Sequence, residues 1–206
     1  MYIPNAFRVD DPAVLFPLMQ RGSFATLVTS DGGVPIASHL PFLIQRTPEQ
    51  GGRLLGHMAR GNPQWKSLTG EREVLVIFEG PHGYVSPSWY VKVPSVPTWN
   101  YAVVHAYGRP RLIEEPAAIA GLLRELTDHH EAGFERPWKM EEVPPGELER
   151  LIRAIVGFEI HITRLEGKFK LSQNKSAEDR AGVIEALSRS EAPLDRELAA
   201  LMTNLP

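Results

Sequence analysis

Four stretches of this 206-residue sequence gather aromatic, amide and basic side chains more densely than a packed core requires. In the first, residues 37–42, Ser38 and Leu40 lie on one face of a predicted strand and His39 lies on the other, because side chains alternate along a strand. The backbone of such a strand can hydrogen-bond the edge of a planar heterocyclic ring. An ordinary half-buried strand is the alternative interpretation.

The second stretch, residues 56–65, predicts a strand that runs into the N-terminus of a helix, with Arg60 and Asn62 at the junction. The free N–H groups and the positive dipole end of a helix favour a phosphate, and arginine adds a bidentate charged donor. The alternative is that Asn62 only caps the helix and Arg60 is solvated. The sequence has neither a Gly-rich P-loop nor the G-x-G-x-x-G pattern, so nucleotide sites of those two types are not expected.

Aromatic residues dominate the third stretch, residues 84–101, which holds two Trp and three Tyr among Ser, Thr, Asn and Pro. This mixture suits a planar aromatic ligand that needs stacking faces and a few oriented donors, although a packed loop or a homodimer contact would use the same residues. The fourth stretch, residues 167–175, is basic and amide-rich and is expected just after the last strand. Its lysines could hold a phosphate or balance negative charge; a solvated turn is the alternative.

The absence of cysteine excludes disulfides, thiolate nucleophiles, iron–sulfur clusters and cysteine zinc sites. Adjacent His129 and His130 point about 100° apart on a predicted helix, so they lack the i, i+4 geometry of a helical zinc site. A lone histidine on or beside a strand is more often a hydrogen-bonded polar residue than a ligand. We therefore predict no metal site, and no Ser-His-Asp or paired-carboxylate pattern identifies a catalytic residue. The histidines near predicted strands are His39, His57, His82, His105 and His161.

Apolar patterns predict about six strands, interspersed with helices and without a regular strand–helix–strand alternation. A tight turn at residues 31–33 joins strands 24–29 and 34–44 into a hairpin. Residues 74–78 are expected to be buried on both faces, and residues 80–83 to turn the chain. Further strands are predicted at 54–58, 99–112 and 158–162, and helices after the caps or prolines at 11–12, 62–63, 116, 144–145, 176 and 193, where Ser176 and Asp179 resemble a capping box. This order favours a mainly β fold, a barrel with peripheral helices.

Composition is that of a soluble globular protein, with 43% hydrophobic and 23% charged residues. No run approaches the roughly 20 apolar residues that span a bilayer, and the N-terminus lacks signal-peptide features, so a cytoplasmic protein without a membrane partner is expected. The net charge of −3 is opposite to the basic surface of most nucleic-acid-binding domains. The length suits one domain over residues 1–206, with residues 170–206 as a C-terminal helical extension.

Taken together, these motifs resemble the PaiB family of FMN-binding negative transcriptional regulators. The resemblance extends from residue 1 to about residue 187. Gly61 stands where the family often has Ala, and Lys175 where it commonly has Arg. The matching motifs are residues 1–4 with Phe7, Ser-His-Leu-Pro-Phe at 38–42, Gly-His-Met-Ala-Arg at 56–60, Asn-Pro-Gln-Trp at 62–65, Ser-Pro-Ser-Trp-Tyr at 86–90, Val-Pro-Thr-Trp-Asn-Tyr at 96–101 and Lys-Leu-Ser-Gln-Asn at 170–174.

The resemblance implies an FMN-binding split β-barrel similar to that of pyridoxamine 5′-phosphate oxidase, normally a homodimer with FMN at the subunit interface. By analogy, residues 38–40 would border the isoalloxazine ring and residues 57–62 would carry the ribityl phosphate. The aromatic loops and residues 170–174 would close the site. The cofactor-binding residues expected on this basis are Ser38, His39, Leu40, His57, Met58, Ala59, Arg60, Asn62, Trp65, Trp89, Trp99, Asn100, Lys170, Ser172, Gln173 and Asn174.

The leading hypothesis from the sequence is an FMN-binding homodimer that acts in redox-linked regulation, as a negative transcriptional regulator. Contact with DNA rests on the family resemblance alone. One alternative is an FMN-dependent oxidoreductase without direct DNA binding, which the net charge favours. The other is a haem-binding split barrel that uses a strand histidine.

Overall fold

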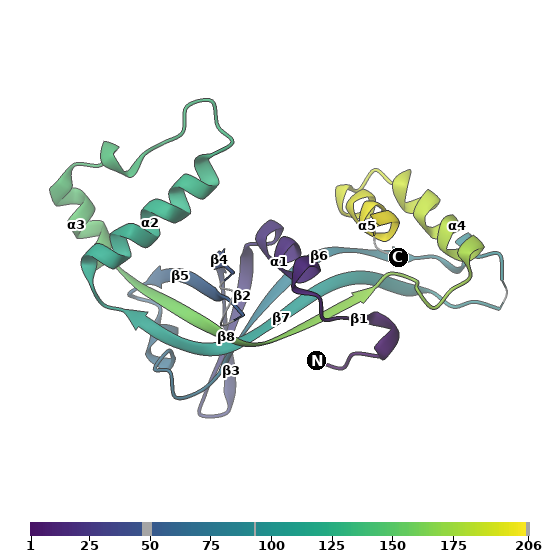
Figure 1. Ribbon diagram of the computed structural model, residues 1–206, viewed down its shortest axis with the longest axis horizontal. Helices are drawn as coiled ribbons and strands as arrows, with labels where there is room; N and C mark the ends of the chain where they lie inside the picture. The colour runs from purple at the N-terminus through teal and green to yellow at the C-terminus, as the bar shows by residue number, and fades with distance from the viewer. Residues whose placement is uncertain (47–50, 93, 205–206) are drawn as a thin grey trace. The chain divides into compact units, whose positions relative to one another are not determined.

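The computed structural model describes residues 1–46, 51–92 and 94–204 (Figure 1). Within these ranges eight strands form a sheet in the order β3-β2-β6-β7-β8-β5-β4, and β1 pairs with β8. The predicted mainly β fold with peripheral helices is confirmed. The strands are β1 (Arg8–Val9), β2 (Phe24–Asp31), β3 (Val34–Pro41), β4 (Leu43–Gln45), β5 (Arg53–Ala59), β6 (Val74–Val85), β7 (Thr98–Ile113) and β8 (Ile155–Lys170). The helices are α1 (Pro12–Arg21), α2 (Pro116–Glu131), α3 (Pro145–Arg153), α4 (Ala177–Ser188) and α5 (Pro193–Asn204), with 3₁₀ helices η1 (Asn5–Phe7), η2 (Pro63–Ser67), η3 (Pro87–Trp89) and η4 (Met140–Glu142).

The chain divides into two compact units. Unit 1 comprises Met1–Arg21, Glu79–His105 and Glu166–Pro206, and unit 2 comprises Gly22–Phe78 and Ala106–Leu165. Strands β6, β7 and β8 each begin in one unit and end in the other. Helices α1, α4 and α5 belong to unit 1, and helices α2 and α3 belong to unit 2.

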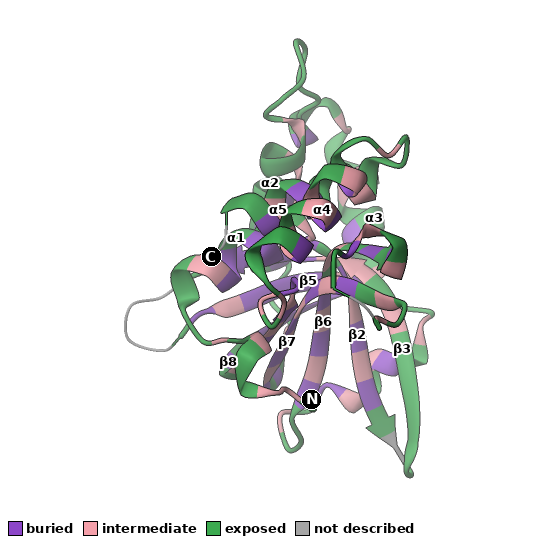
Figure 2. Ribbon diagram, turned by 90° about the vertical axis from the view of Figure 1, so that its right-hand side faces the viewer, coloured by how far each residue is buried: buried purple, intermediate pink, exposed green. Residues whose placement is uncertain are grey.

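Unit 2 contains the predicted hairpin, which the structure confirms. Strands β2 and β3 turn at Gly32 and Gly33, whose φ angles of 59° and 89° lie in the left-handed region that glycine adopts without steric cost. Strand β2 also pairs with β6, whereas β3 is exposed along most of its length (Figure 2). The ring of Phe42 packs edge-on against Phe78 and Phe158, with centroids 6.1 Å apart in both pairs. These three rings form part of the core next to the end of β3.

Helix α2 covers β4 and β5 with a stripe of apolar residues at helical spacing. Leu122 and Leu126 of this helix form a buried cluster with Leu43 and Leu55. None of the helices in the described ranges combines the length and the apolar character that crossing a bilayer requires.

Unit 1 is built on the ribbon of β6 and β7, one face of which is covered by helices. A Cβ on Gly80 would lie 2.9 Å from Leu18 of α1, and a Cβ on Gly83 would lie 3.1 Å from Leu198 of α5. The two glycines therefore let the helices approach the strand closely. The opposite face of the ribbon carries Trp99, which is 55% exposed.

The structure differs from the predictions along the central strands. Residues 80–83, expected to turn the chain, continue β6 to Val85, because their glycines accommodate helices instead of bending the backbone. Residues 74–78, expected to be buried on both faces, alternate between buried and half-buried, since only one strand face packs into the core. Residues 167–170, expected to follow the last strand, are its end.

Candidate functional site

The predicted site residues fall into two groups, one in each unit. The group in unit 2, here named the hairpin cluster, contains residues 38–40 of β3 and residues 57–65 around the end of β5. The group in unit 1, the lysine–aromatic cluster, contains Trp89, Trp99, Asn100 and residues 168–175. Each cluster joins stretches that are far apart in the sequence.

Asn62 connects the two parts of the hairpin cluster. Its Nδ2 donates to the Ser38 hydroxyl at 2.9 Å, and its Oδ1 accepts from the backbone N–H of Gln64 at 3.0 Å. Ser38 and Leu40 are half-buried on β3, whereas His39 is exposed. Nδ1 of His39 lies 3.0 Å from the Thr26 hydroxyl. Asn62 is therefore both a helix cap and, through Ser38, the connection between β3 and the end of β5.

Arg60 is exposed, but its guanidinium group is held in place. Its Nε donates to the carbonyl oxygen of Arg153 and its Nη2 to that of Ile155, both at 2.8 Å. The indole Nε1 of Trp65 donates to the Arg60 carbonyl oxygen at 3.1 Å. Both partners are backbone carbonyl oxygens, and no carboxylate of the described residues pairs with the guanidinium. Its positive charge is therefore not neutralised. It is suited to bind an anion.

The helix that follows Arg60 is shorter than the sequence predicts. It is the five-residue 3₁₀ helix η2, capped by Asn62 and followed by Gly70, whose φ of 82° redirects the chain. So short a helix has little macrodipole, so the dipole expected to attract a phosphate here is mostly absent. The charge of Arg60 is what remains of the predicted phosphate site.

Two buried polar atoms of the hairpin cluster lack a hydrogen-bond partner in the described part of the chain, His57 Nδ1 and Gln64 Oε1. Burial lowers the pKa of His57, so its ring is neutral at pH 7. Gln64 is 1% exposed, and its Nε2 lies 3.3 and 3.1 Å from the carbonyl oxygens of Leu27 and Ile36. Gln64 therefore fixes η2 to the hairpin. The site prediction omitted this residue, because a short polar turn in the sequence gave no sign of burial.

Lys170 and Asn100 join the start of β7 to the end of β8 in the lysine–aromatic cluster. Nζ of Lys170 donates to the Thr98 hydroxyl and to the Trp99 carbonyl oxygen, both at 2.6 Å. Asn100 is fully buried and donates from Nδ2 to Ser172 Oγ at 2.9 Å, while its Oδ1 has no partner within the described ranges. Ser172 has a φ of 63°, a strained conformation for a residue with a side chain. The strain places its hydroxyl against Asn100.

Three lysines give this cluster its positive charge. Burial, together with the charges of Lys168 and Lys175, lowers the pKa of Lys170. Nζ of Lys168 lies 5.4 Å from the ring centroid of Tyr101, and Nζ of Lys175 lies 4.4 Å from that of Tyr90. Aromatic faces surround the amines, and in the described part of the chain none of the three forms an ion pair with a carboxylate.

A groove of about 400 Å³ lies on the exposed face of the β6–β7 ribbon in unit 1. His82, Trp99 and Tyr101 line it together with Glu79. The ring centroids of Trp99 and His82 are 6.5 Å apart. Since Lys168 lies over the ring of Tyr101, the groove and the lysines are adjacent. This surface offers flat aromatic faces beside positive charge.

Other predicted residues have side chains that already bind their own turn or that take no part in the hydrogen bonds described above. Oε1 of Gln173 accepts from the Leu171 N–H at 2.7 Å, and its Nε2 donates to the Phe169 carbonyl oxygen at 2.6 Å. Gln173 thus closes its own turn. The remaining predicted residues are buried Met58, half-buried Trp89, and exposed Ala59 and Asn174.

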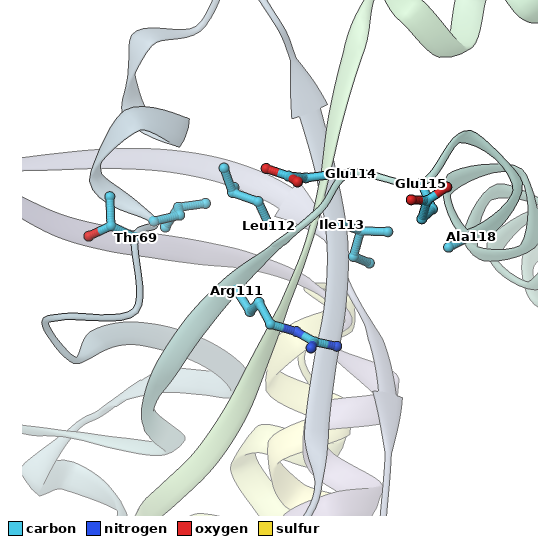
Figure 3. Close-up of a pocket in the computed structure, with 8 residues that line it drawn as sticks. Thr69, Arg111, Leu112, Ile113, Glu114, Glu115 and Ala118 are labelled. Atoms are coloured by element: carbon cyan, nitrogen blue, oxygen red, sulfur yellow. The ribbon is translucent and has the colours of Figure 1, made fainter.

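A second cavity, of about 570 Å³, lies in unit 2 where β7 ends and α2 begins (Figure 3). Its lining residues include Arg111, Glu114 and Glu115. None of the lining residues was predicted from the sequence as a cofactor-binding residue. Nε and Nη2 of Arg111 lie 2.8 and 2.7 Å from Oε1 of the buried Glu159. Because that charge is already paired, the cavity has less to offer an anion than either cluster.

Known proteins resemble this chain in sequence and in fold. Residues 1–164 match a family model described as "Putative FMN-binding domain". The protease synthase and sporulation protein PAI 2 of Bacillus subtilis (strain 168) is 38% identical over 202 residues, 98% of this chain and 96% of that protein.

Two solved structures share the fold over most of the chain. The flavocytochrome Anf3 from Azotobacter vinelandii has a TM-score of 0.59 at 19% identity, over 85% of this chain and 75% of its own. The FAD and haem binding protein from Mycobacterium smegmatis has a TM-score of 0.58 at 19% identity, over 84% and 78%. At these identities the likeness shows the fold alone, and it confirms the fold class predicted from the sequence.

Proposed function

Because the chain belongs to the PaiB family of FMN-binding proteins, we propose that it binds FMN noncovalently. The hairpin cluster and the lysine–aromatic cluster are the two parts of the chain that offer groups for this cofactor. One observation carries the proposal. Arg60 in the hairpin cluster and Lys170 in the lysine–aromatic cluster carry positive charge that no carboxylate of the described residues pairs with, and an aromatic ring lies beside Lys170. FMN has the matching chemistry, an anionic phosphate and a flat ring with polar edges.

The chemistry of the donor groups fits FMN. Arg60 in one cluster and Lys170 in the other are each a charged donor of the kind that binds a phosphate, and Trp99 has an exposed aromatic face for the ring. The buried His57 Nδ1 and Asn100 Oδ1 lack partners among the described residues, as expected of polar atoms in a site that a ligand completes. In this proposal residues 38–40 border the isoalloxazine ring.

We further propose that the functional protein is a homodimer. Tyr84 and Trp99 are 46% and 55% exposed on the open face of the β6–β7 ribbon, with ring centroids 6.0 Å apart. Large aromatic side chains are enriched at protein interfaces, and a second copy of the chain would cover this face. The cofactor would then be enclosed by residues of both subunits.

The bound flavin would supply one- and two-electron chemistry, and we propose that it serves redox-linked regulation, in line with the family. The B. subtilis relative is named for protease synthesis and sporulation. A second candidate is an FMN-dependent oxidoreductase without direct DNA binding. The net charge of −3 favours this second function, because autonomous DNA-binding domains usually carry a basic surface.

The visible absorption spectrum of the purified protein tests the cofactor. Flavin bands, or saturable binding of added FMN, support the proposal, whereas a Soret band indicates haem instead. A colourless protein that does not bind added FMN contradicts the proposal. Turnover that depends on NAD(P)H then favours the oxidoreductase, and salt-sensitive binding to a defined operator favours the regulator.

A further inference from the structure

The loop that carries two of the aromatic residues is bound by the first turn of α4. We name residues 86–92 the aromatic loop. Oδ1 of Asp179 accepts hydrogen bonds from the backbone N–H groups of Val91 at 2.7 Å and Lys92 at 3.1 Å. Asp179 is 2% exposed, and the hydrogen bonds from Lys92 and Val91 hold the pKa of this carboxyl below its ordinary value.

The capping box expected at Ser176 is only half present. Ser176 Oγ accepts from the Asp179 N–H at 3.2 Å, as the pattern predicts. The carboxylate of Asp179, which would bond back to the cap in a complete box, instead binds the aromatic loop. Aspartate at this position therefore links two segments that are more than eighty residues apart in the sequence.

Neighbouring residues of the same segment contact the aromatic loop as well. Lys175 lies over the ring of Tyr90, with Nζ 4.4 Å from the centroid. A Cβ on Gly182 would lie 2.3 Å from the carbonyl oxygen of Trp89, so α4 packs directly on η3. Ser172, at the start of the segment, bonds to Asn100. Residues 172–182 thus connect the aromatic loop to Asn100 of the lysine–aromatic cluster, all within unit 1.

We propose that Asp179 is a positioning residue of the cofactor site. It holds the aromatic loop so that Trp89, a member of the lysine–aromatic cluster, and Tyr90, which lies under Lys175, keep their places. This inference rests on the proposed function, since the loop matters only if the cluster binds FMN. Helix α4, which carries Asp179, is then part of the site.

Two measurements on Asp179→Ala test the proposal. Without FMN, trypsin should cleave the Lys92–Val93 bond about tenfold faster or more, since two hydrogen bonds to a charged group no longer restrain the loop. FMN affinity should fall by about tenfold as well. Glu178→Ala is the matched control: Glu178 is exposed in the same first turn, and its loss removes the same charge. Both values should stay at the wild-type level in that control.

Gly182→Ala provides a second route that leaves Asp179 intact. Alanine favours the helix, but its Cβ displaces the Trp89 carbonyl, so the loop should loosen while α4 remains formed. Gly121→Ala in α2, where a Cβ meets nothing within 4 Å, is its control. If Asp179→Ala accelerates cleavage at every Lys and Arg, the variant has unfolded and Gly182→Ala decides the question.

The outcomes separate this proposal from the function on which it rests. Unchanged cleavage at Lys92 in both folded variants overturns the restraint of the loop. Faster cleavage with unchanged FMN affinity overturns the role of the loop in the site. If the wild-type protein itself binds no FMN, the proposed function fails and with it the positioning role, while the cleavage rates still report whether Asp179 restrains the loop.

Discussion

Arg60 differs from several other arginines of the chain in the groups that its guanidinium binds. Arg124 and Arg150 bind the exposed carboxylates of Glu141 and Glu147. Among the described residues, the partners of the Arg60 guanidinium are backbone carbonyls, which orient it without neutralising its charge. The same distinction applies to Lys170, whose hydrogen-bond partners in the described part of the chain are a hydroxyl and a carbonyl oxygen. Positive charge that is oriented but not paired is the feature that an anionic cofactor requires.

The first prediction concerns which of the two charged side chains, Arg60 or Lys170, binds the phosphate. Replacing the phosphate-binding residue, in Arg60→Met or Lys170→Met, should lower FMN affinity by about 10- to 100-fold, since a hydrogen bond between charged groups contributes about 1.5–3 kcal/mol. Affinity for riboflavin, which lacks the phosphate, should stay the same. Isothermal titration of both ligands into both variants measures this. Equal losses for the two ligands would show that the residue shapes the site and does not bind the phosphate.

The second prediction concerns the pKa of Lys170, which burial and two neighbouring lysines lower from its ordinary value of 10.5. Lys168→Met should raise this pKa by removing one like charge, and Lys168→Arg should leave it nearly unchanged. The lowered pKa means that the folded protein holds this proton less tightly than the unfolded chain. The contribution of Lys170 to the free energy of unfolding therefore increases as the pH rises towards 10.5. An NMR titration of the lysine side chains gives the pKa directly, and a pKa unaffected by Lys168→Met would contradict the coupling.

Among the elements, the β2–β3 hairpin sets the position of residues 38–40, and its turn depends on two glycines. The third prediction is that Gly33→Ala lowers the free energy of unfolding by about 1–2 kcal/mol, because alanine is strained at a φ of 89°. Gly61→Ala should instead raise it by about 0.4–1 kcal/mol, since Gly61 has open space and no positive φ. Denaturation in urea measures both. A Gly33→Ala protein as stable as the wild type would refute the strained turn.

The sequence predicted those elements whose signals are local. The hairpin, strand β5, and helices α2 and α4 follow from periodicity, turn glycines and caps, and the structure has them. The continuation of β6 through Gly80 was not predictable in this way, because its cause is the close approach of Leu18 from α1. The length of β8 was missed for a similar reason, since its basic end pairs with strands that are distant in the sequence, among them β1.

The site was predictable to a different extent. Asn62 and Lys170 were named from motifs, and the structure gives both of them partners in distant strands. Gln64 and Asp179 were not predicted as site residues, although both are buried and bind backbone atoms of other segments. Their roles depend on which segments meet in space, and no spacing along the sequence reveals that.

For the whole molecule, cofactor binding and self-association affect the same measured quantity, the midpoint of thermal unfolding. FMN at 100 times its Kd should stabilise the protein by about 2.7 kcal/mol, which for a chain of this size raises the midpoint by roughly 5–11 °C. Riboflavin at equal concentration should raise it less, because the charged donors then lack the phosphate.

The fourth prediction combines these two effects. If FMN is enclosed between two copies of the chain, diluting the protein at constant free FMN should lower the midpoint, because the dimer dissociates on dilution. Differential scanning fluorimetry over a hundredfold range of protein concentration, with the mass in solution measured in parallel, gives both values. A midpoint raised by FMN but independent of protein concentration, for a protein whose mass is that of one chain, would refute the homodimer and leave the flavin site intact. A midpoint that FMN does not move would contradict the flavin site itself.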